Sequence, residues 1–306
     1  MTVRAPLIAS MRSQDARRNC ARPFSLSKRD APRHFVVHEG SCSARRANAS
    51  TSPQLDNPLR PARSPVRRDR HEQRGGRMAA DRPLGILMLD TRFPRIVGDI
   101  GNAETFPFPV IYQKLEGVGP GDAVAAAPDR PRIRAVLAAN AKALAEKGAI
   151  GISTSCGFLA LFQQALAMVS PVPVATSALM LVPMMARTLP GGRRVGVITA
   201  SRENLTAAHL AAVDASRDTP VEGMPPNGSF ARTFLANGTE LDRDEVEREV
   251  LLAGRRLVAR HPDVGAVVLE CTNLPPYAAA LRRDLGLPVY DVTDLLRLFH
   301  AGLKRD

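Results

Sequence analysis

Short apolar segments alternate with helix-like segments over most of the chain, and this alternation restricts the fold more than any other feature of the sequence. The apolar runs predict strands at residues 84–90, 108–117, 149–154, 172–177, 193–201, 265–270 and 287–292. Helical patterns follow most of them, at residues 131–148, 158–169, 201–213, 242–261, 275–286 and 293–303. Strands and helices in turn are typical of an α/β fold with parallel sheets.

The pattern occurs twice along the chain. In each series the first strand contains a glycine and a later strand ends at a cysteine. Gly85 precedes Cys156 by 71 residues, and Gly196 precedes Cys271 by 75 residues. We therefore expect an α/β fold of two similar Rossmann-like halves, related by a pseudo-twofold axis, with an active-site cleft between them. The predicted halves are residues 81–175 together with 290–306, and residues 176–289.

The first 80 residues differ from the rest in charge and composition. They contain 17 Lys and Arg against 6 Asp and Glu, whereas the remainder is nearly neutral, with 25 against 24. The net charge of +12 therefore gives no reason to expect nucleic-acid binding by the body. Because residues 1–80 are rich in Arg, Ser and Pro, they are predicted to be a disordered basic tail. This tail is either a mis-assigned start, with Met78 as the natural one, or a targeting segment.

No metal, cofactor or membrane site is indicated. Only two cysteines lie in the body, so a disulfide scaffold is not expected. The histidines of the body are scattered, which predicts no metal centre. No lysine is placed as a pyridoxal Schiff-base residue would be, so no cofactor is expected. The chain has no apolar segment of membrane-spanning length and its start does not resemble a secretory signal, which together favour a cytoplasmic location.

Cys156 and Cys271 carry the functional prediction. Each follows a predicted strand and precedes a helix start, at the sheet edge where parallel α/β folds bind ligands. Free N–H groups and the helix dipole at such a place lower the pKa of a thiol. Two thiols on opposite sides of a ligand could remove a proton from one face of a carbon and deliver one to the other. The alternative is that each cysteine is a small buried apolar residue.

The segments around both thiols resemble the aspartate/glutamate racemase superfamily, which comprises cofactor-independent amino-acid racemases and their hydantoin racemase relatives. The matching motifs are TSCGFL at residues 154–159, RRVGVITAS at 193–201 and LECTNLP at 269–275. The resemblance covers residues 84–303. It implies an isomerase in which Cys156 and Cys271 are the catalytic residues. They would invert the acidic α-carbon of a small amino acid, a related carboxylate or a hydantoin.

Three departures from glutamate racemases put glutamate itself in doubt. Those enzymes follow the first cysteine with Asn-Thr, where this chain has Gly157 and Phe158. They have His where this chain has Asn273, and Asp-Ser-Gly where it has residues 90–92. Small polar residues at strand ends and in the loop 97–109 are predicted to contact substrate, although each also fits a cap or turn: Asp90, Asn102, Thr154, Ser155, Thr176, Thr199, Thr272 and Asn273.

Three functions stay open at this point, each with a small-molecule carboxylate as the partner. The first is the two-thiol racemase. The second is a single-thiol relative, of the arylmalonate decarboxylase or maleate isomerase kind. The third is a binding protein without catalysis. The loop 97–109 fits either a lid or a structural loop packed through Phe106 and Phe108, and the sequence is compatible with a homodimer.

Overall fold

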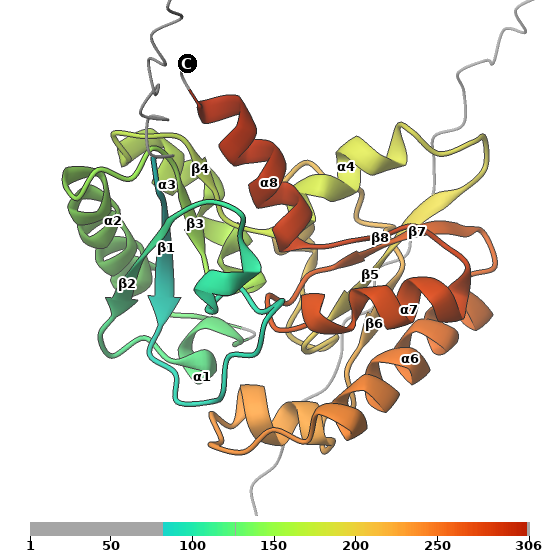
Figure 1. Cartoon of the computed structure of the whole chain (residues 1–306). Helices are drawn as coiled ribbons and strands as arrows, with labels where there is room; N and C mark the ends of the chain where they lie inside the picture. Colours follow the sequence, from blue (N-terminus) through green and yellow to red (C-terminus); the bar gives the residue numbers. More distant parts are fainter. Residues whose placement is uncertain (1–81, 126, 305–306) are drawn as a thin grey trace, which may run out of the picture. The chain divides into compact units, whose positions relative to one another are not determined.

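Two four-stranded parallel sheets form the framework of the structure, a computed structural model that describes residues 82–304 except residue 126 (Figure 1). The strand order is β2-β1-β3-β4 in the first sheet and β6-β5-β7-β8 in the second. When the strands of each half are numbered from its first strand, both sheets have the order 2-1-3-4. The predicted α/β fold with two similar halves is therefore confirmed, and the described residues all fall in one compact unit.

The strands are short and the helices lie between them in the chain. The strands are β1 (Leu84–Leu89), β2 (Val110–Leu115), β3 (Ile152–Thr154), β4 (Val174–Ala175), β5 (Arg194–Thr199), β6 (Val221–Gly223), β7 (Val264–Leu269) and β8 (Val289–Tyr290). The α-helices are α1 (Pro120–Ala123), α2 (Arg130–Glu146), α3 (Gln163–Val169), α4 (Leu181–Ala186), α5 (Ala207–Ala211), α6 (Arg243–Arg260), α7 (Ala278–Leu285) and α8 (Val292–Leu303). The other short helices are the 3₁₀ helices η1 (Ala103–Thr105), η2 (Gly157–Phe162), η3 (Ala178–Met180) and η5 (Pro275–Tyr277) and the π-helix η4 (Ala231–Leu235).

A glycine at the same place in each half lets a helix pack closely on its sheet. A Cβ atom on Gly85 would lie 2.9 Å from Cδ1 of Leu144 in α2, and one on Gly196 would lie 2.8 Å from Cδ2 of Leu257 in α6. A larger residue at either position would push the helix away from the strand. The matched glycines of the sequence therefore have the same packing role in both halves.

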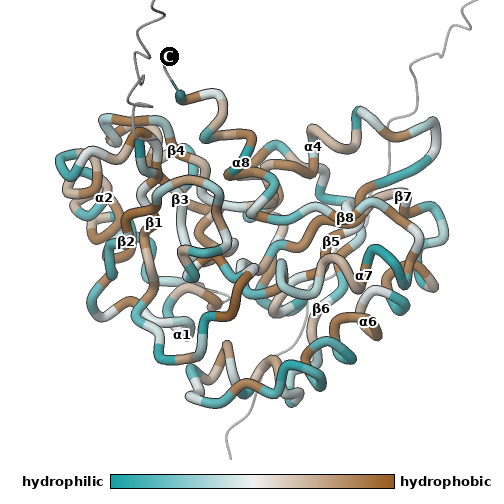
Figure 2. The backbone as a smooth tube through the Cα atoms, viewed as in Figure 1, coloured by the Kyte–Doolittle hydropathy of each residue, from teal (hydrophilic) through white to brown (hydrophobic). Residues whose placement is uncertain are grey.

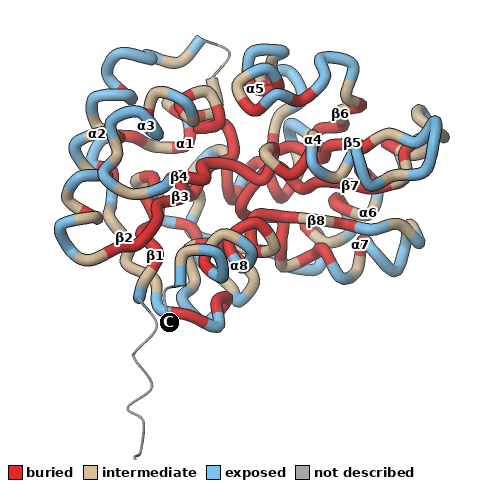
Figure 3. The backbone as a smooth tube through the Cα atoms, turned by 90° about the horizontal axis from the view of Figure 1, so that it is seen from above, coloured by how far each residue is buried: buried red, intermediate tan, exposed pale blue. Residues whose placement is uncertain are grey.

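The core follows the strands, and the helices cover them. Strands β1 and β7 are almost entirely buried, whereas α2 and α6 bury one side and expose the other (Figures 2 and 3). Helix α8 follows β8 in the chain but packs on the first sheet. It lies so close to Gly151, the residue before β3, that a Cβ there would be 2.5 Å from Cδ1 of Leu303. The last helix therefore ties the two halves together.

Two helices differ from their sequence predictions. The helix expected from Ser201 begins only at Ala207, because Thr206 caps it and its backbone N–H donates to Nδ1 of His209 at 3.1 Å. The helix expected over 158–169 starts as the 3₁₀ turn η2 and becomes α-helical at Gln163. No helix within residues 82–304 combines the length and apolar character needed to cross a membrane. The predicted tail, residues 1–80, lies outside the described residues.

Candidate active site

Both thiols line one small cavity at the carboxyl ends of the two sheets. Cys156 follows β3 and Cys271 follows β7, and each is less than a tenth exposed. Neither is in a disulfide. The cavity has a volume of about 20 Å³, which is room for about one water molecule. The fold thus brings together two thiols from different sheets, in a conformation closed around them.

Phenylalanine side chains from both halves wall this cavity: Phe93, Phe158 and Phe234. The rings of Phe93, after β1, and Phe234, in η4, meet edge to face with centroids 5.0 Å apart. Beside them, the Arg92 backbone N–H donates to Oδ1 of Asn237 at 2.7 Å. The π-helical turn of the second half therefore closes the cavity against the loop that follows β1.

A larger cavity of about 570 Å³ lies next to the thiol cavity, at the carboxyl ends of β5 and β6. Ala200 and Leu235 line both cavities. Leu235 directly follows Phe234 in η4, and π-helical turns are frequent at functional sites. The boundary between the two cavities thus includes the π-helical turn η4 and the end of β5.

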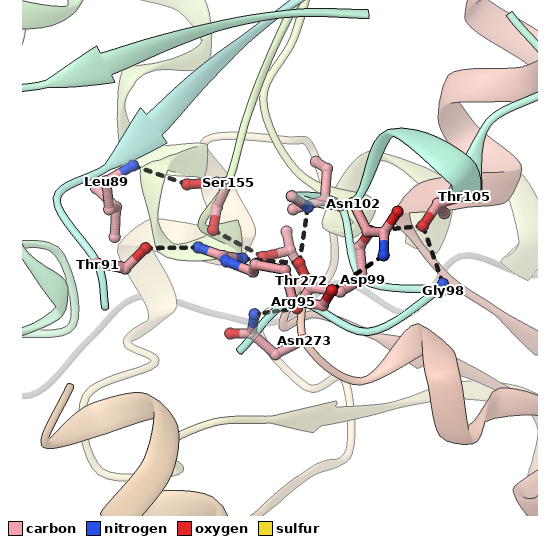
Figure 4. Close-up of polar contacts among 12 residues, drawn as sticks. Leu89, Thr91, Arg95, Gly98, Asp99, Asn102, Thr105, Ser155, Thr272 and Asn273 are labelled. Carbon is pink, nitrogen blue, oxygen red and sulfur yellow. Dashed lines mark hydrogen bonds and ion pairs between the residues drawn. The ribbon is translucent and has the colours of Figure 1, made fainter. Parts of the chain in front are cut away.

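A chain of polar contacts runs from the second thiol through Asn273 and Asp99 to Arg95. Figure 4 shows the part of this chain from Asn273 to Arg95. Sγ of Cys271 donates to Oδ1 of Asn273 at 3.5 Å, and Nδ2 of Asn273 donates to Oδ2 of Asp99 at 2.6 Å. Arg95 forms an ion pair with the other oxygen of Asp99 at 2.8 Å. The sequence analysis singled out Asn273 but neither Asp99 nor Arg95. The loop 97–109 therefore docks on the segment that carries Cys271.

Two further hydroxyl groups join the strand ends. Oγ of Ser155 accepts from the Leu89 backbone N–H at 2.9 Å, and Oγ1 of Thr272 donates to the Ser155 carbonyl at 2.7 Å. The first contact links β1 to the Cys156 turn, and the second links that turn to the Cys271 turn. Ser155 and Thr272 thus position the thiol-bearing turns relative to each other, and Ser155 also lines the cavity.

A buried carboxylate that sequence reasoning missed lies at the cavity with the two thiols. Glu270 directly precedes Cys271, is fully buried and lines the cavity. Its Oε2 accepts from Oγ1 of Thr199 at 2.7 Å, so Thr199 orients this carboxylate. Gly157 makes room for it, because a Cβ there would lie 2.2 Å from Oε1 of Glu270. The glycine that departs from the glutamate racemase motif is therefore required by this glutamate.

The environment disfavours ionisation of both thiols. Burial, and secondly the Glu270 carboxylate, raise the pKa of Cys156 to about 12, although the backbone N–H groups of Phe158 and Leu159 act in the opposite direction. The same two causes raise the pKa of Cys271 well above its usual value. The sequence-based expectation of a lowered pKa is wrong, because desolvation outweighs the N–H groups of the short turn.

Four other predicted contact residues lie away from the cavity lining. Asp90 pairs with Lys114 at 3.0 Å, and Asn102 caps η1 by accepting from the Glu104 backbone N–H. Oγ1 of Thr154 donates to the Thr176 carbonyl, and Oγ1 of Thr176 donates to Gln163. The structure thus gives Asp90 a partner in a surface ion pair, Asn102 one in a helix cap, and Thr154 and Thr176 buried partners.

Burial also raises the pKa of Glu270, from 4.5 to about 7. Between these values the folded protein binds a proton that the unfolded chain does not, so stability falls as pH rises through this range. Ionised Glu270 costs on the order of 3 kcal/mol by the pKa difference. We expect Glu270→Gln to increase the free energy of unfolding at about pH 8 and to change it little near pH 4. Urea denaturation at both pH values measures this, and an equal effect at both would contradict it.

The family of the chain follows from its sequence profile. The profile described as Asp/Glu/Hydantoin racemase matches residues 119–296, which include both thiols. The chain belongs to this family. The matched segment covers more than half of the chain. The match agrees with the resemblance of the motifs around Cys156 and Cys271.

Curated relatives carry the name of a lyase. The chain is 28% identical over 226 residues to a dimethylsulfoniopropionate lyase of Durusdinium sp. clade D, in a match covering 72% of this chain and 74% of that protein. It is 31% identical over 232 residues to dimethylsulfoniopropionate lyase 5 of Emiliania huxleyi, covering 72% of this chain and 45% of that protein. The chain thus spans less than half of this second, longer relative.

Solved structures of two kinds are also similar. Unliganded arylmalonate decarboxylase matches with a TM-score of 0.49 and 16% identity, over 72% of this chain and 92% of that one. Glutamate racemase from Francisella tularensis in complex with D-glutamate matches with a TM-score of 0.45 and 16% identity, over 74% and 84%.

Proposed function

We propose that this protein is a thiol-dependent lyase that splits dimethylsulfoniopropionate into dimethyl sulfide and acrylate. The single observation that carries the proposal is the cavity, in which two free thiols and three phenylalanine side chains face the same small space. The lyase name of the relatives supports the choice of substrate. Removal of a proton next to a carboxylate is the step that this substrate shares with the substrates of racemases.

The reaction needs one base and no further reactant. A thiolate takes a proton from the carbon next to the carboxylate, and the electron pair of that C–H bond becomes the new carbon–carbon double bond. The bond from the β-carbon to sulfur breaks, and its electrons stay on sulfur, which leaves as neutral dimethyl sulfide. Acrylate remains, and the thiol passes its proton to water. We assign the role of this base to one of the two thiols that line the cavity, Cys156 or Cys271.

The aromatic wall suits the cationic end of the substrate. A sulfonium has no N–H or O–H to donate, and a cation without donors is bound best by aromatic faces. Phe93 already stacks with one cation, because the Arg95 guanidinium lies 4.3 Å from its ring centre. Phe234 meets the Phe93 ring edge to face and lies in η4, the turn that closes the cavity. Because the cavity holds about one water molecule, part of its lining has to move to admit substrate.

We expect Phe234→Leu to raise KM for dimethylsulfoniopropionate by about two- to thirtyfold, since a cation–aromatic contact is worth roughly 0.5–2 kcal/mol. Leucine keeps the site apolar but removes the ring. Phe106→Leu is the matched control, because Phe106 is a buried ring outside the cavity lining. Initial rates of dimethyl sulfide release give both values. An equal change in KM for the two variants would argue against aromatic binding of the cation.

The direct test of the proposal is product formation. Purified protein is incubated with dimethylsulfoniopropionate, dimethyl sulfide is measured by gas chromatography, and acrylate is measured by liquid chromatography. We expect the two products in equal amounts. Absence of both products, with the protein folded and saturating substrate present, would refute this function.

Racemisation is the second candidate, because the thiols come from two sheets with the same strand order. Two bases on opposite faces of a carbon are what inversion requires. A panel of D- and L-amino acids and hydantoins in deuterium oxide tests it. Deuterium uptake at the α-carbon with formation of the opposite enantiomer, and no products from dimethylsulfoniopropionate, would favour the racemase. A single-thiol decarboxylase or a binding protein would show neither result.

A further inference from the structure

Glu270 combines deep burial with an oxygen that lacks a partner. Oε2 accepts from Thr199, but Oε1 has no hydrogen-bond partner among the described residues. A buried carboxylate oxygen left without a donor is costly, and the cost is tolerated where the group has a further use. Two other buried polar atoms of the described chain lack partners, on His209 and Tyr277, but neither residue lines the thiol cavity. Glu270 does.

Residues from both halves of the fold surround the Glu270 carboxylate. Glu270 directly precedes Cys271 at the end of β7, and the carboxylate lies against Gly157, which directly follows Cys156. A Cβ at residue 157 would lie 2.2 Å from both Oε1 and the carbonyl oxygen of Glu270. The first half thus provides a gap beside its own thiol, and the carboxyl group of Glu270 from the second half fills this gap. The unpartnered oxygen is next to both candidate bases.

We infer that Oε1 of Glu270 binds the cationic group of the substrate, and that this contact activates the two thiols as bases. The inference rests on the proposed function in one respect, that the substrate is a carboxylate with a positive charge close to the reacting carbon. A sulfonium and an ammonium both meet this description. The residue is a specificity determinant that sequence reasoning did not identify.

The activation follows from the charges that face the thiols. Besides burial, the Glu270 carboxylate raises the pKa of both Cys156 and Cys271. Arg95 lowers the pKa of Cys156 and Asp99 raises that of Cys271, but these two form an ion pair with each other. A cation paired with Glu270 cancels the negative charge next to the thiols. One thiol then loses its proton to water and becomes the base, so the substrate itself completes the catalytic group.

A pair of ligands of equal shape tests the binding step. 3-(Trimethylammonio)propanoate carries a cation and a poor leaving group, and 4,4-dimethylpentanoate has carbon in place of the charged nitrogen. Isothermal titration calorimetry should show that the wild-type protein binds the cation at least about tenfold more tightly, and that Glu270→Gln removes this preference. Glu222→Gln is the matched control, because Glu222 is a buried carboxylate on β6 outside the thiol cavity. It should keep the preference.

Thiol ionisation provides a readout that is independent of turnover. The ultraviolet absorbance of the thiolates is measured as a function of pH. The absorbance of the Cys156→Ser/Cys271→Ser variant is subtracted as the background. The cationic ligand should lower the midpoint of thiol ionisation in the wild type by at least about one pH unit. Glu270→Gln should have the lower midpoint without ligand, and the ligand should not lower it further.

The outcomes separate the inference from the proposed function. If dimethylsulfoniopropionate is cleaved and Glu270→Gln keeps its preference for the cation, the inference is wrong and the lyase function stands. If the preference depends on Glu270 but no dimethyl sulfide forms, the inference stands and the substrate is a different cationic carboxylate. Failure of the wild-type protein to discriminate between the two ligands, or to bind either, would overturn the inference.

Discussion

Replacing both thiols with serine should slow dimethyl sulfide release by at least about a thousandfold. A serine hydroxyl is far less acidic than a thiol, so it is a poor base near neutral pH, and a positioned general base contributes about a hundred- to ten-thousandfold. Elimination removes one proton from one carbon, so the two single variants should differ. One of Cys156→Ser and Cys271→Ser should be almost inactive, and the other should keep at least about a tenth of the wild-type rate.

The comparison of the single variants also separates the two candidate reactions. A two-base racemase would lose interconversion of enantiomers in both variants, and each variant would keep deuterium exchange with only one enantiomer, opposite between the two. Circular dichroism and thermal melting control for folding, because both cysteines are buried. A double variant that cleaves dimethylsulfoniopropionate at the wild-type rate would rule out thiol catalysis altogether.

Gly157→Ala should lower kcat/KM by at least about a hundredfold. The new methyl group would lie 2.2 Å from the carbonyl and carboxylate oxygens of Glu270, so the strand end that carries Glu270 and Cys271 has to shift. A misplacement of about 1 Å in a reacting site can lower the rate about a hundredfold. Overpacking also costs roughly 1–3 kcal/mol of stability.

Gly302→Ala is the control for this substitution, because a Cβ at residue 302 would meet nothing within 4 Å. It should leave activity unchanged. Steady-state rates and urea denaturation measure both effects. Wild-type activity in Gly157→Ala would show that the close approach of Gly157 to Glu270 has no part in the reaction.

The arrangement of the fold could be predicted because it depends on local patterns. Apolar strands, amphipathic helices and the matched glycines Gly85 and Gly196 are visible in the sequence, and the glycines do pack α2 and α6 in the same way. The meeting of Cys156 and Cys271 in one cavity follows from two parallel sheets whose carboxyl ends face each other.

The polar partners of the thiols could not be predicted in this way. Glu270 stands at a strand end, where an acid is usually solvated, and its burial depends on the gap at Gly157 in the other half. Asp99 reaches Asn273 across 174 residues of chain. The π-helical turn that carries Phe234 is only five residues long, so the sequence shows no hydrophobic periodicity that would predict it.

The direction of the thiol pKa shift was missed for a related reason. The sequence displays the helix starts that lower a thiol pKa, but it does not display desolvation. Burial raises the pKa of both Cys156 and Cys271 by more than the backbone N–H groups lower it. The raised pKa values favour the protonated thiols in the free protein, and this is the reason for proposing that a bound cation activates them.

The thiols of this cavity are proposed to remove a proton from the carbon next to a carboxylate. Proton nuclear magnetic resonance in deuterium oxide tests this step, with dimethylsulfoniopropionate and the amino-acid panel as ligands. With the wild-type protein, we expect the α-proton signal of dimethylsulfoniopropionate to disappear while the vinyl signals of acrylate appear, and we expect neither change with the Cys156→Ser/Cys271→Ser variant. Unchanged α-proton signals for every ligand with the wild-type protein, or equal loss of signal with the double variant, would contradict it.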